Sequence, residues 1–427
     1  MRRHPTRRQF LAGGVASGAA LVRPVARETA VRFGFVGVGA RGTGLLRTLL
    51  SLPDTQVPAV CDIVAERAEA AAALVERARG RRPEVYARGE RDFERLCERD
   101  DLDAVLTATP WEWHAPVMLA AMRAGKAGLT EVPACLTLAE AQALVRTSEA
   151  TSRACMMLEN VCYFEEVLAI LRMAREGLFG DLLNFGAGYQ HDVRFLCFTE
   201  DGRLTWRGRH FATRNGNQYP THAIGPVAWW AGIGRGDRIV SLSSVSTASL
   251  GLRAYATQRF GASHPLAKRT YAQGDVNTTV LRTALGRTIT LSFDCCTPRP
   301  YDLIFRAQGT AGIVEAGAGR AYFAGRSPAP DAWEPLAPLV AKHTHPTWAR
   351  LREAALRDGG HGGCDYVMLH EVVEALRAGT PLPQDVYDAV TWSAIVPLSA
   401  DSVRRGGAVV PFPDFSGGRW KSRPPVE

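Results

Sequence analysis

The feature that most constrains this chain is a glycine-rich turn between an apolar strand and an apolar helix. Residues 31–36 form a short β-type run, and Gly37, Gly39 and Gly42 lead from it into a helix rich in leucine. Such glycines let backbone amides approach a phosphate at the positive end of the helix. A second strand over 57–61 ends at Asp62, where a carboxylate accepts hydrogen bonds from a ribose 2′-hydroxyl and repels a 2′-phosphate. The pattern predicts a site for NAD rather than NADP.

Strands and helices continue to alternate after this unit. Strands are expected over 103–108, 127–131 and 154–158, with helices near 91–99, 115–124 and 138–150. This alternation predicts a doubly wound parallel sheet of the Rossmann type. Ligands bind beyond the carboxyl ends of its strands, here at 109–114, 131–133 and 159–160. Trp111 and Trp113 in the first of these loops point to a ligand contact, and the alternative is that they only pack the loop.

The second half has a different pattern. Runs of β character cover 183–191, 239–248, 277–285, 287–295 and 302–308, and short glycine turns join the later ones. They predict an α+β domain with a large open, mostly antiparallel sheet, which packs one face on helices and leaves the other for a partner or a ligand. At 427 residues the chain is too long for one ordinary core. We expect a dinucleotide-binding domain over 27–160 and a second domain over 161–427, whose C-terminal segment packs back on the first.

Polar and aromatic residues gather near the junction of the two halves. They are Tyr163, Tyr189, Trp206, Arg207, the stretch 215–222 and Tyr301. Tyr219 and His222 are three residues apart, so a helix that begins near Pro220 projects both from its first turn. The dipole of that helix disfavours a protonated imidazole and leaves His222 a base or a hydrogen-bond donor. For any one of these residues taken alone, the alternative to a role in a functional site is a purely structural role.

The start of the chain carries much of the net charge of +8. Five arginines and no acid lie within residues 1–26, and Arg7 and Arg8 precede a mildly apolar stretch that ends in small residues. This layout predicts a twin-arginine signal peptide and a periplasmic or secreted protein, with a disordered basic tail as the alternative. The remaining +3 no longer favours nucleic acid as a partner. No apolar run reaches the ~18 residues that a membrane span needs.

Nine scattered cysteines without Cys-x-x-Cys pairs favour buried thiols over a disulfide framework. A zinc site is the competing use of His191, Asp192, His210, His222 and His361, but these residues lack the spacing of metal ligands. We therefore expect no metal.

The first half resembles the Gfo/Idh/MocA oxidoreductases, which are NAD(P) enzymes that act on sugars. That family usually has Glu-Lys-Pro where this chain has Glu131, Val132 and Pro133, so the lysine that assists ordinary dehydrogenase chemistry is absent. A closer resemblance is to glycoside hydrolase family 109, the NAD-dependent α-N-acetylgalactosaminidases. It is carried by GVGARG (37–42), TPWEWHAPV (109–117), NGNQYPTHAIGPVA (215–228) and GHGGCDYVM (360–368), among other segments.

The resemblance to family 109 implies roles for individual residues. It implies NAD contacts at Arg41, Gly42, Asp62, Trp111, Glu112, Trp113, His114, Glu131, Val132, Asn160, Trp206 and Tyr219, beside Gly37 and Gly39 of the turn. It implies substrate contacts at Tyr189, Arg207, Tyr219, Pro220, Thr221, His222 and Tyr301. Tyr219 and His222 are the expected acid/base pair, and Tyr163 is a third candidate.

The implied reaction is hydrolysis of a terminal α-N-acetylgalactosamine or a related hexosamine or hexose. The sugar is transiently oxidised at C3, eliminated across C1 and C2, hydrated and reduced again, so NAD is recycled. Two alternatives remain: a sugar oxidoreductase with net hydride transfer, and a binding protein for NAD or sugar without catalysis. Because proteins of this superfamily often associate through the open sheet, a homo-oligomer is also expected.

Overall fold

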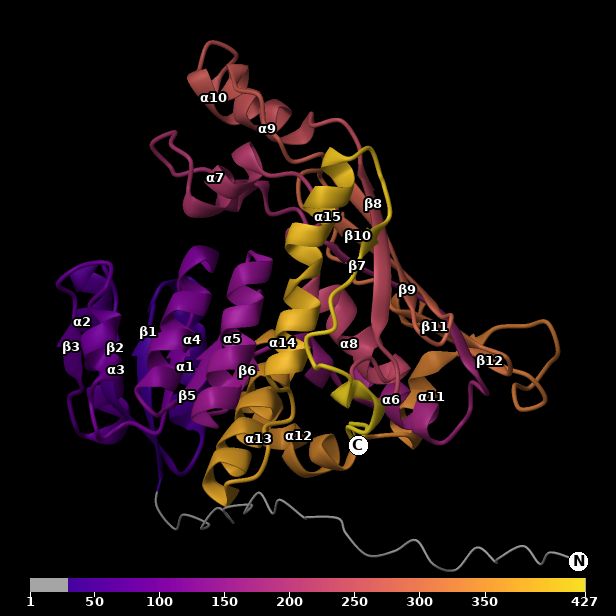
Figure 1. Cartoon of the computed structure of the whole chain (residues 1–427), viewed down its shortest axis with the longest axis horizontal. Coiled ribbons are helices and arrows are strands. Elements are labelled where there is room, and N and C mark those ends of the chain that lie inside the picture. The colour runs from indigo at the N-terminus through magenta and orange to yellow at the C-terminus, as the bar shows by residue number, and fades with distance from the viewer. Residues whose placement is uncertain (1–29, 427) are drawn as a thin grey trace, which may run out of the picture.

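The computed structural model describes residues 30–426, so the predicted signal peptide over 1–26 lies outside the described residues. Two sheets stand side by side in it, with helices around and between them (Figure 1). Within the described residues no helix is both long and apolar enough to cross a bilayer.

The first sheet has the predicted parallel topology. Its strands are β1 (Val31–Val36), β2 (Thr55–Cys61), β3 (Glu84–Tyr86), β4 (Ala104–Thr107), β5 (Ala127–Thr130) and β6 (Cys155–Met157). Its helices are α1 (Ala40–Ser51), α2 (Ala65–Arg79), α3 (Phe93–Cys97), α4 (His114–Arg123) and α5 (Leu138–Thr151), and the single turn η1 (Trp111–Trp113) precedes α4. The strand order is β3-β2-β1-β4-β5-β6, so the order reverses between β1 and β4. A doubly wound sheet forms its ligand crevice at that reversal.

The strands of the first sheet are apolar because helices cover both of its faces. Every residue of β4, β5 and β6 is buried. A strand with two covered faces needs a continuous apolar run rather than an alternating one. The short edge strand β3 was not predicted.

The second sheet has nine strands in the order β14-β13-β12-β11-β7-β10-β9-β8-β15. They are β7 (Leu182–Gln190), β8 (Ile239–Ser246), β9 (Val276–Thr283), β10 (Thr288–Asp294), β11 (Arg306–Gly309), β12 (Gly312–Glu315), β13 (Arg320–Phe323), β14 (Glu334–Pro335) and β15 (Val410–Pro411). Only the central pair β7 and β10 is parallel, which confirms a mostly antiparallel sheet. Along β9 buried and exposed residues alternate, so one face lies on the core and the other faces outward.

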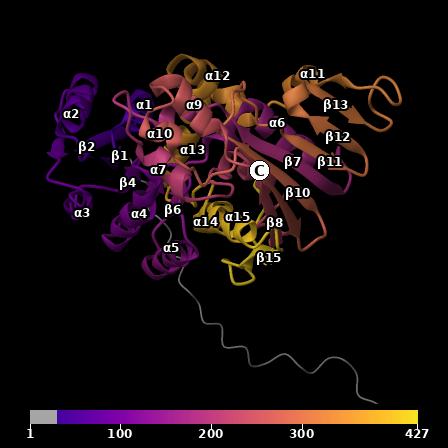
Figure 2. The same cartoon turned by 90° about the horizontal axis from the view of Figure 1, so that it is seen from above.

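Helices and single turns of the second half complete the core. They are η2 (Asn160–Tyr163), α6 (Glu165–Arg175), η3 (Arg194–Cys197), α7 (Trp206–Thr213), α8 (Thr221–Ala231), α9 (Gly251–Phe260), α10 (Pro265–Lys268), η4 (Ala316–Ala318), α11 (Leu336–Lys342), α12 (Pro346–Asp358), η5 (His361–Gly363), α13 (Cys364–Ala378), α14 (Val386–Ser393), α15 (Ile395–Arg404) and η6 (Arg419–Lys421). The late helices join the two sheets: α13 contacts α1, α14 contacts α5 and β6, and α15 contacts β8 (Figure 2).

One predicted strand is shorter than expected. The run 302–308 forms a strand only from Arg306, because Ile304 and Phe305 have positive φ angles of 66° and 32°. Asp302 makes an isolated bridge to Gln190 instead. Left-handed backbone at two successive residues interrupts strand pairing, and hydropathy does not reveal it.

Candidate active site

The glycine turn between β1 and α1 has the steric properties expected of a phosphate-binding turn. Gly37 has φ +82°, and a Cβ there would lie 2.8 Å from the backbone nitrogen of Thr109. A Cβ on Gly42 would lie 1.9 Å from the carbonyl oxygen of Gly37, whereas one on Gly39 would meet nothing within 4 Å. Gly37 and Gly42 therefore allow the turn to close, and Gly39 leaves open space beside it.

The start of α1 faces that space without a competing side chain. Gly39 is the N-cap, and no side chain of residues 30–426 caps the first turn by a hydrogen bond. The unpaired amides and positive dipole end of such a helix attract a phosphate. The turn therefore fits the pyrophosphate of a dinucleotide.

Asp62 lies at the end of β2, as the sequence predicts. One of its carboxylate oxygens accepts a hydrogen bond from the Val38 amide at 2.8 Å, and the other accepts one from the Val64 amide at 2.9 Å. These bonds hold the carboxylate beside the glycine turn. A fixed carboxylate there fits the ribose hydroxyls of NAD.

Arg41 lies at the centre of an ion-pair network. Its Nε donates to Glu131 at 2.7 Å, and its Nη1 and Nη2 donate to both oxygens of Asp365 at 2.6 and 3.0 Å. Asn160 also donates to Asp365, at 2.7 Å, and His361 Nδ1 lies 2.9 Å from the same carboxylate. The network therefore brings two predicted cofactor residues, Arg41 and Asn160, to the Asp365 carboxylate of α13, and Glu131 joins it through Arg41.

Sequence reasoning assigned no role to Asp365, although it lies within the segment 360–368. Burial alone would raise its pKa, but hydrogen bonds from His361 and Arg41 hold that pKa well below its usual range. Burial alone would also lower the pKa of the Arg41 guanidinium. The negative charges of Glu131 and Asp365 have the larger effect, so the pKa is raised. Both groups are therefore ionised at neutral pH.

Aromatic rings form a wall at the loop that follows β4. Trp111 is buried and meets Trp206 edge to face at 5.0 Å and Tyr219 at 5.8 Å between ring centroids. The Arg207 guanidinium lies 4.8 Å from the Trp111 ring, 4.9 Å from the Trp206 ring and 5.7 Å from the Tyr219 ring. Cation–π contacts of this kind hold Arg207 in place. Predicted cofactor and substrate residues are thus in contact.

Two other residues of this loop make packing contacts with neighbouring elements. Glu112 accepts a hydrogen bond from His210 Nε2 at 3.0 Å, which ties α7 to the loop. Burial opposes the charge of Glu112, but His210 lowers its pKa. Trp113 packs edge to face on Phe93 at 5.9 Å, within the parallel-sheet domain. For the Trp113 ring, loop packing is therefore the role that the structure shows.

His114 joins two strand-end loops. Its ring nitrogens lie 2.7 Å from the carbonyl oxygen of Pro133 and 2.9 Å from that of Thr109. Burial lowers the pKa of this imidazole. Because both ring nitrogens face backbone carbonyls, a contact of His114 with NAD would come from its main chain.

The predicted acid/base pair lies in a cluster of aromatic side chains. The ring of His222 stands edge to face to those of Tyr219 and Tyr189, at 4.9 and 5.2 Å. Tyr189 lies 4.5 Å from Tyr219 and 6.2 Å from Tyr301, which also contacts His191 at 5.0 Å. The structure thus brings together residues from α8, β7 and the segment after β10.

Burial raises the pKa of all three tyrosines of this cluster above the ordinary value. Tyr189, Tyr219 and Tyr301 therefore keep their protons at neutral pH. Neutral phenols donate hydrogen bonds, which suits contacts with sugar oxygens.

Pro220 and Thr221 lie where the sequence predicts. Pro220 is the N-cap of α8, and Thr221 is its first residue. The Thr221 hydroxyl is buried without a hydrogen-bond partner among the described residues. Val132 is buried in the core.

Tyr163 is not brought into the cluster. Its ring packs on Trp229 at 5.4 Å, its hydroxyl is buried, and burial raises its pKa well above the ordinary value. Its catalytic role stays a prediction that this placement does not support.

Glu159 is a second residue whose role was missed. It follows β6 and lies 2.7 Å from His222 Nδ1. The sequence indicated only that a strand-end loop begins there, because the contact joins residues 63 positions apart.

Cysteines and histidines do not form further centres in the described part of the chain. All nine cysteines are free and buried, as expected. No group of three or more His, Cys, Asp or Glu side chains between residues 30 and 426 is arranged to hold a metal ion.

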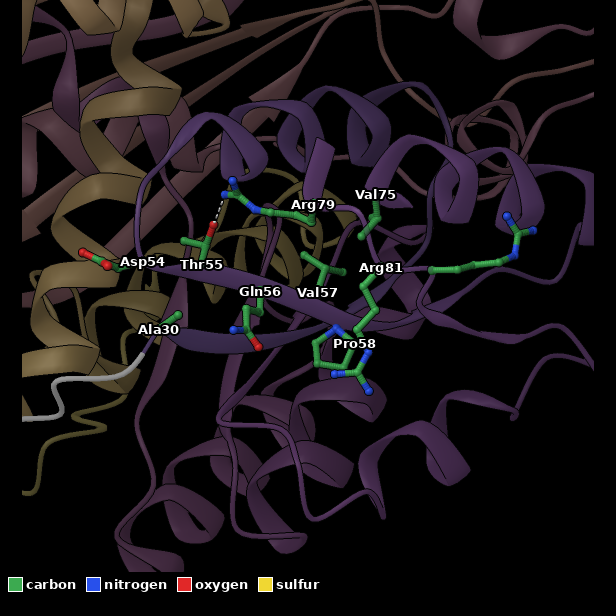
Figure 3. A pocket seen from close by; sticks show the side chains of 10 residues that line it. Ala30, Asp54, Thr55, Gln56, Val57, Pro58, Val75, Arg79 and Arg81 are labelled. Carbon is green, nitrogen blue, oxygen red and sulfur yellow. Dashed lines mark hydrogen bonds between the residues drawn. The ribbon is translucent and has the colours of Figure 1, made fainter. Parts of the chain in front are cut away.

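A separate cavity of about 340 Å³ lies near the amino-terminal ends of the strands of the first sheet (Figure 3). Thr55, Val57 and Arg79 line it, near the start of β2. Because α/β sheets bind ligands beyond the carboxyl ends of their strands, this cavity is not the candidate site.

Solved structures define the class of protein to which this fold belongs. The chain superposes on an oxidoreductase domain protein from Kribbella flavida with a TM-score of 0.70 and 19% identity, over 90% of this chain and 100% of that one. A levoglucosan dehydrogenase in complex with NADH gives a TM-score of 0.69 with 18% identity, over 90% and 100% of the two chains. The model of an oxidoreductase family with an NAD-binding Rossmann fold matches residues 31–159. The fold is that of the Gfo/Idh/MocA oxidoreductases.

The second half identifies the family. The model of the glycosyl hydrolase 109 C-terminal domain matches residues 163–422. An α-N-acetylgalactosaminidase of Tannerella forsythia is 41% identical over 93% of this chain and 88% of that protein. A glycosyl hydrolase family 109 protein of Saccharopolyspora erythraea is 43% identical over 94% and 86%. The chain belongs to glycosyl hydrolase family 109, as its motifs predicted.

Proposed function

We propose that this protein hydrolyses terminal α-N-acetylgalactosamine, or a related hexosamine or hexose, with NAD as a recycled cofactor. The observation that carries the proposal is the contact of Tyr219 with both His222 and the wall formed by Trp111 and Arg207. Proton-transfer groups there lie beside the predicted cofactor residues. The name of the Tannerella forsythia relative supports the choice of sugar.

The buried carboxylates of the site favour this route over direct hydrolysis. Direct glycoside hydrolysis uses two carboxyl groups that flank the bond, one as acid and one as base or nucleophile. Here Glu131 is paired with Arg41, and Glu159 is held by His222. Neither side chain is free to play the second role.

When bound, NAD supplies a reversible hydride acceptor for the sugar. The residues of this chain do the rest: the glycine turn and Asp62 bind and orient the dinucleotide, and the aromatic wall excludes water. Tyr219 and His222 move protons at the sugar, and Arg207 donates hydrogen bonds to its oxygens.

The reaction is tested with p-nitrophenyl α-N-acetylgalactosaminide in deuterated water. We expect release of nitrophenol without accumulation of NADH at 340 nm, and deuterium at C2 of the released sugar. Accumulation of NADH with each sugar oxidised would instead identify a sugar oxidoreductase. Binding without C2 exchange would identify a non-catalytic binding protein.

The acid/base pair is tested by substitution. Tyr219→Phe and His222→Ala are expected to lower turnover at least 100-fold, because general acid–base groups contribute about 10²–10⁴-fold. Both variants should retain NAD, measured by absorbance of the released cofactor. Turnover within threefold of the wild type in either variant would contradict its assignment.

We propose in addition that twin-arginine export delivers the protein to the periplasm or beyond. Arg7 and Arg8 carry this proposal. Replacing both with lysine is expected to leave the full-length protein in the cytoplasmic fraction, measured by cell fractionation. Unchanged export of this double variant would contradict the proposal.

We also propose a homodimer formed through the outer face of the second sheet. Val245 on β8 and Val280 on β9 are 54% and 44% exposed. Thr278, Thr290 and Ser292 lie between or beside them and carry no charge. Arg282 is exposed on the same face of β9, so this apolar patch has a cation beside it. An exposed patch of β-branched residues suits contact with a second copy of the chain.

A further inference from the structure

Glu159 is a carboxylate buried completely beside the catalytic histidine. Its side chain has 0% exposure, and that of His222 has 13%. Oε1 of Glu159 lies 2.7 Å from His222 Nδ1 and also accepts a hydrogen bond from the Val161 amide at 3.2 Å. Oε2 is buried and has no hydrogen-bond partner among the described residues. The imidazole is therefore the main stabilising contact of this carboxylate.

The fold is built to allow this contact. Glu159 follows β6, and His222 is the second residue of α8. A Cβ on Gly225, one turn further along α8, would lie 2.9 Å from Cγ of Glu159 and 2.9 Å from Sγ of Cys162. Glycine at this position lets α8 approach close enough for the imidazole to reach the carboxylate.

The backbone of Glu159 is fixed as well. Its amide donates to the Met157 carbonyl at 2.9 Å, and its carbonyl accepts a hydrogen bond from Gln384 Nε2 at 3.2 Å. The backbone is held from both sides, and the Val161 amide also binds Oε1, so the carboxylate has a defined position beside the histidine ring. It determines the ring orientation.

A carboxylate at Nδ1 decides which nitrogen carries the proton of a neutral imidazole. Nδ1 keeps its hydrogen to donate to the carboxylate, so Nε2 presents a lone pair. When Nε2 takes up a proton, the adjacent negative charge stabilises the imidazolium. Among the described residues no hydrogen bond occupies Nε2, and the rings of Tyr189 and Tyr219 flank the imidazole.

We propose that Glu159 is a positioning residue that keeps the proton of His222 on Nδ1 and so makes Nε2 the base for the C2 proton of the sugar. The proposal rests on the proposed glycosidase function and deepens it. Glu159 touches neither substrate nor cofactor in this role and acts only through His222.

Glu159→Gln keeps the shape of the side chain and removes its charge. We expect kcat to fall about 100-fold or more with KM within threefold of the wild type, because an uncharged partner stabilises the imidazolium less. We also expect the acidic limb of the pH profile of kcat to move to lower pH, because the negative charge beside the imidazole is removed. A purely structural role would lower kcat without moving that limb, and this result would overturn the proposal, as would an unchanged kcat.

Glu176→Gln is the matched control. Glu176 lies 3.3 Å from His343 Nε2 in a second carboxylate–histidine pair, at the end of α6 and outside the site. Its loss should leave kcat and the pH profile unchanged. Wild-type C2 exchange, measured in parallel, separates the two hypotheses: its absence contradicts the proposed function, whereas its presence with an unaffected Glu159→Gln variant contradicts only this inference.

A measurement on the unaltered protein keeps the inference testable if Glu159→Gln fails to fold. Nitrogen-15 NMR of histidine-labelled protein at neutral pH reports which ring nitrogen is protonated, and His222→Gln identifies the signal. We expect a protonated Nδ1 and a bare Nε2 for His222. The opposite tautomer would overturn the proposal.

Discussion

Gly42 and Gly44 lie two residues apart in α1 but have different surroundings. A Cβ on Gly42 would lie 1.9 Å from the Gly37 carbonyl oxygen, whereas one on Gly44 would meet nothing within 4 Å. Gly42→Ala is therefore expected to destabilise the protein by about 1–3 kcal/mol and to release NAD, because the turn must open. Gly44→Ala should be neutral or stabilising by about 0.5–1 kcal/mol. Urea unfolding measures the stability of each variant, and absorbance of the released cofactor measures its NAD content. Equal effects of the two substitutions would contradict the steric argument.

The residues whose positions the sequence predicts well are those set by local chain geometry. Gly37, Gly42 and Asp62 follow from a turn and a strand end within one βαβ unit. Asp365 and Glu159 contact partners 324 and 63 positions away. No periodicity marks such pairs, since only tertiary packing creates them. Trp113 lies in a predicted ligand loop and its ring packs on Phe93, while its contact with NAD stays a prediction.

At the scale of elements, α13 connects the second domain to the start of α1, next to the glycine turn, through an ion pair. Asp365 in its first turn binds Arg41, and its carboxylate is 2% exposed. Asp365→Asn leaves a partly buried guanidinium with a weaker partner, so we expect NAD to dissociate at least tenfold faster. Dissociation is followed by fluorescence after dilution into excess competitor. Asp54→Asn, which removes a more exposed ion pair between Arg377 of the same helix and the first domain, is the control and should change the rate little.

The same ion pair gives a pH dependence with a defined sign. The pKa of Asp365 is lowered in the folded protein, so its contribution to stability is present above the usual carboxyl pKa of about 4 and is lost as the pH falls below that value. The difference in unfolding free energy between wild type and Asp365→Asn should therefore be constant from pH 7 to about pH 5. It should shrink below about pH 4, as urea titrations at each pH would show. A difference that grows on acidification would contradict the assignment.

The sequence also predicts which helices and strands form better than it predicts the residues at which they begin and end. Alternation of strands and helices predicted the parallel sheet, because each strand is buried on both faces. The late start of β11 depends on the positive φ angles of Ile304 and Phe305, and the edge strand β3 is only three residues long. Neither property has a hydropathy signal strong enough to be predicted.

At the scale of the whole molecule, the outer face of the nine-stranded sheet is the surface that the fold leaves open. Val280 on β9 and Val245 on β8 point outward from neighbouring strands, while Leu281 and Leu242 beside them point to the core. The two valines therefore contribute apolar area that the core does not use, and a second copy would cover it. We expect the wild type to elute as a dimer in size-exclusion chromatography with light scattering.

Charge on that face should separate the subunits without disturbing the site. Val245→Glu with Val280→Glu places four carboxylates in one symmetric interface, where like charges repel and lose hydration. We expect the double variant to be a monomer that retains NAD, because neither residue contacts the cofactor turn or α13. Leu285→Glu is a matched control: Leu285 is 61% exposed but lies in the turn between β9 and β10 rather than on the sheet face. A dimer that survives the double substitution would contradict this interface, and a monomeric Leu285→Glu variant would place the contact at the edge of the sheet instead.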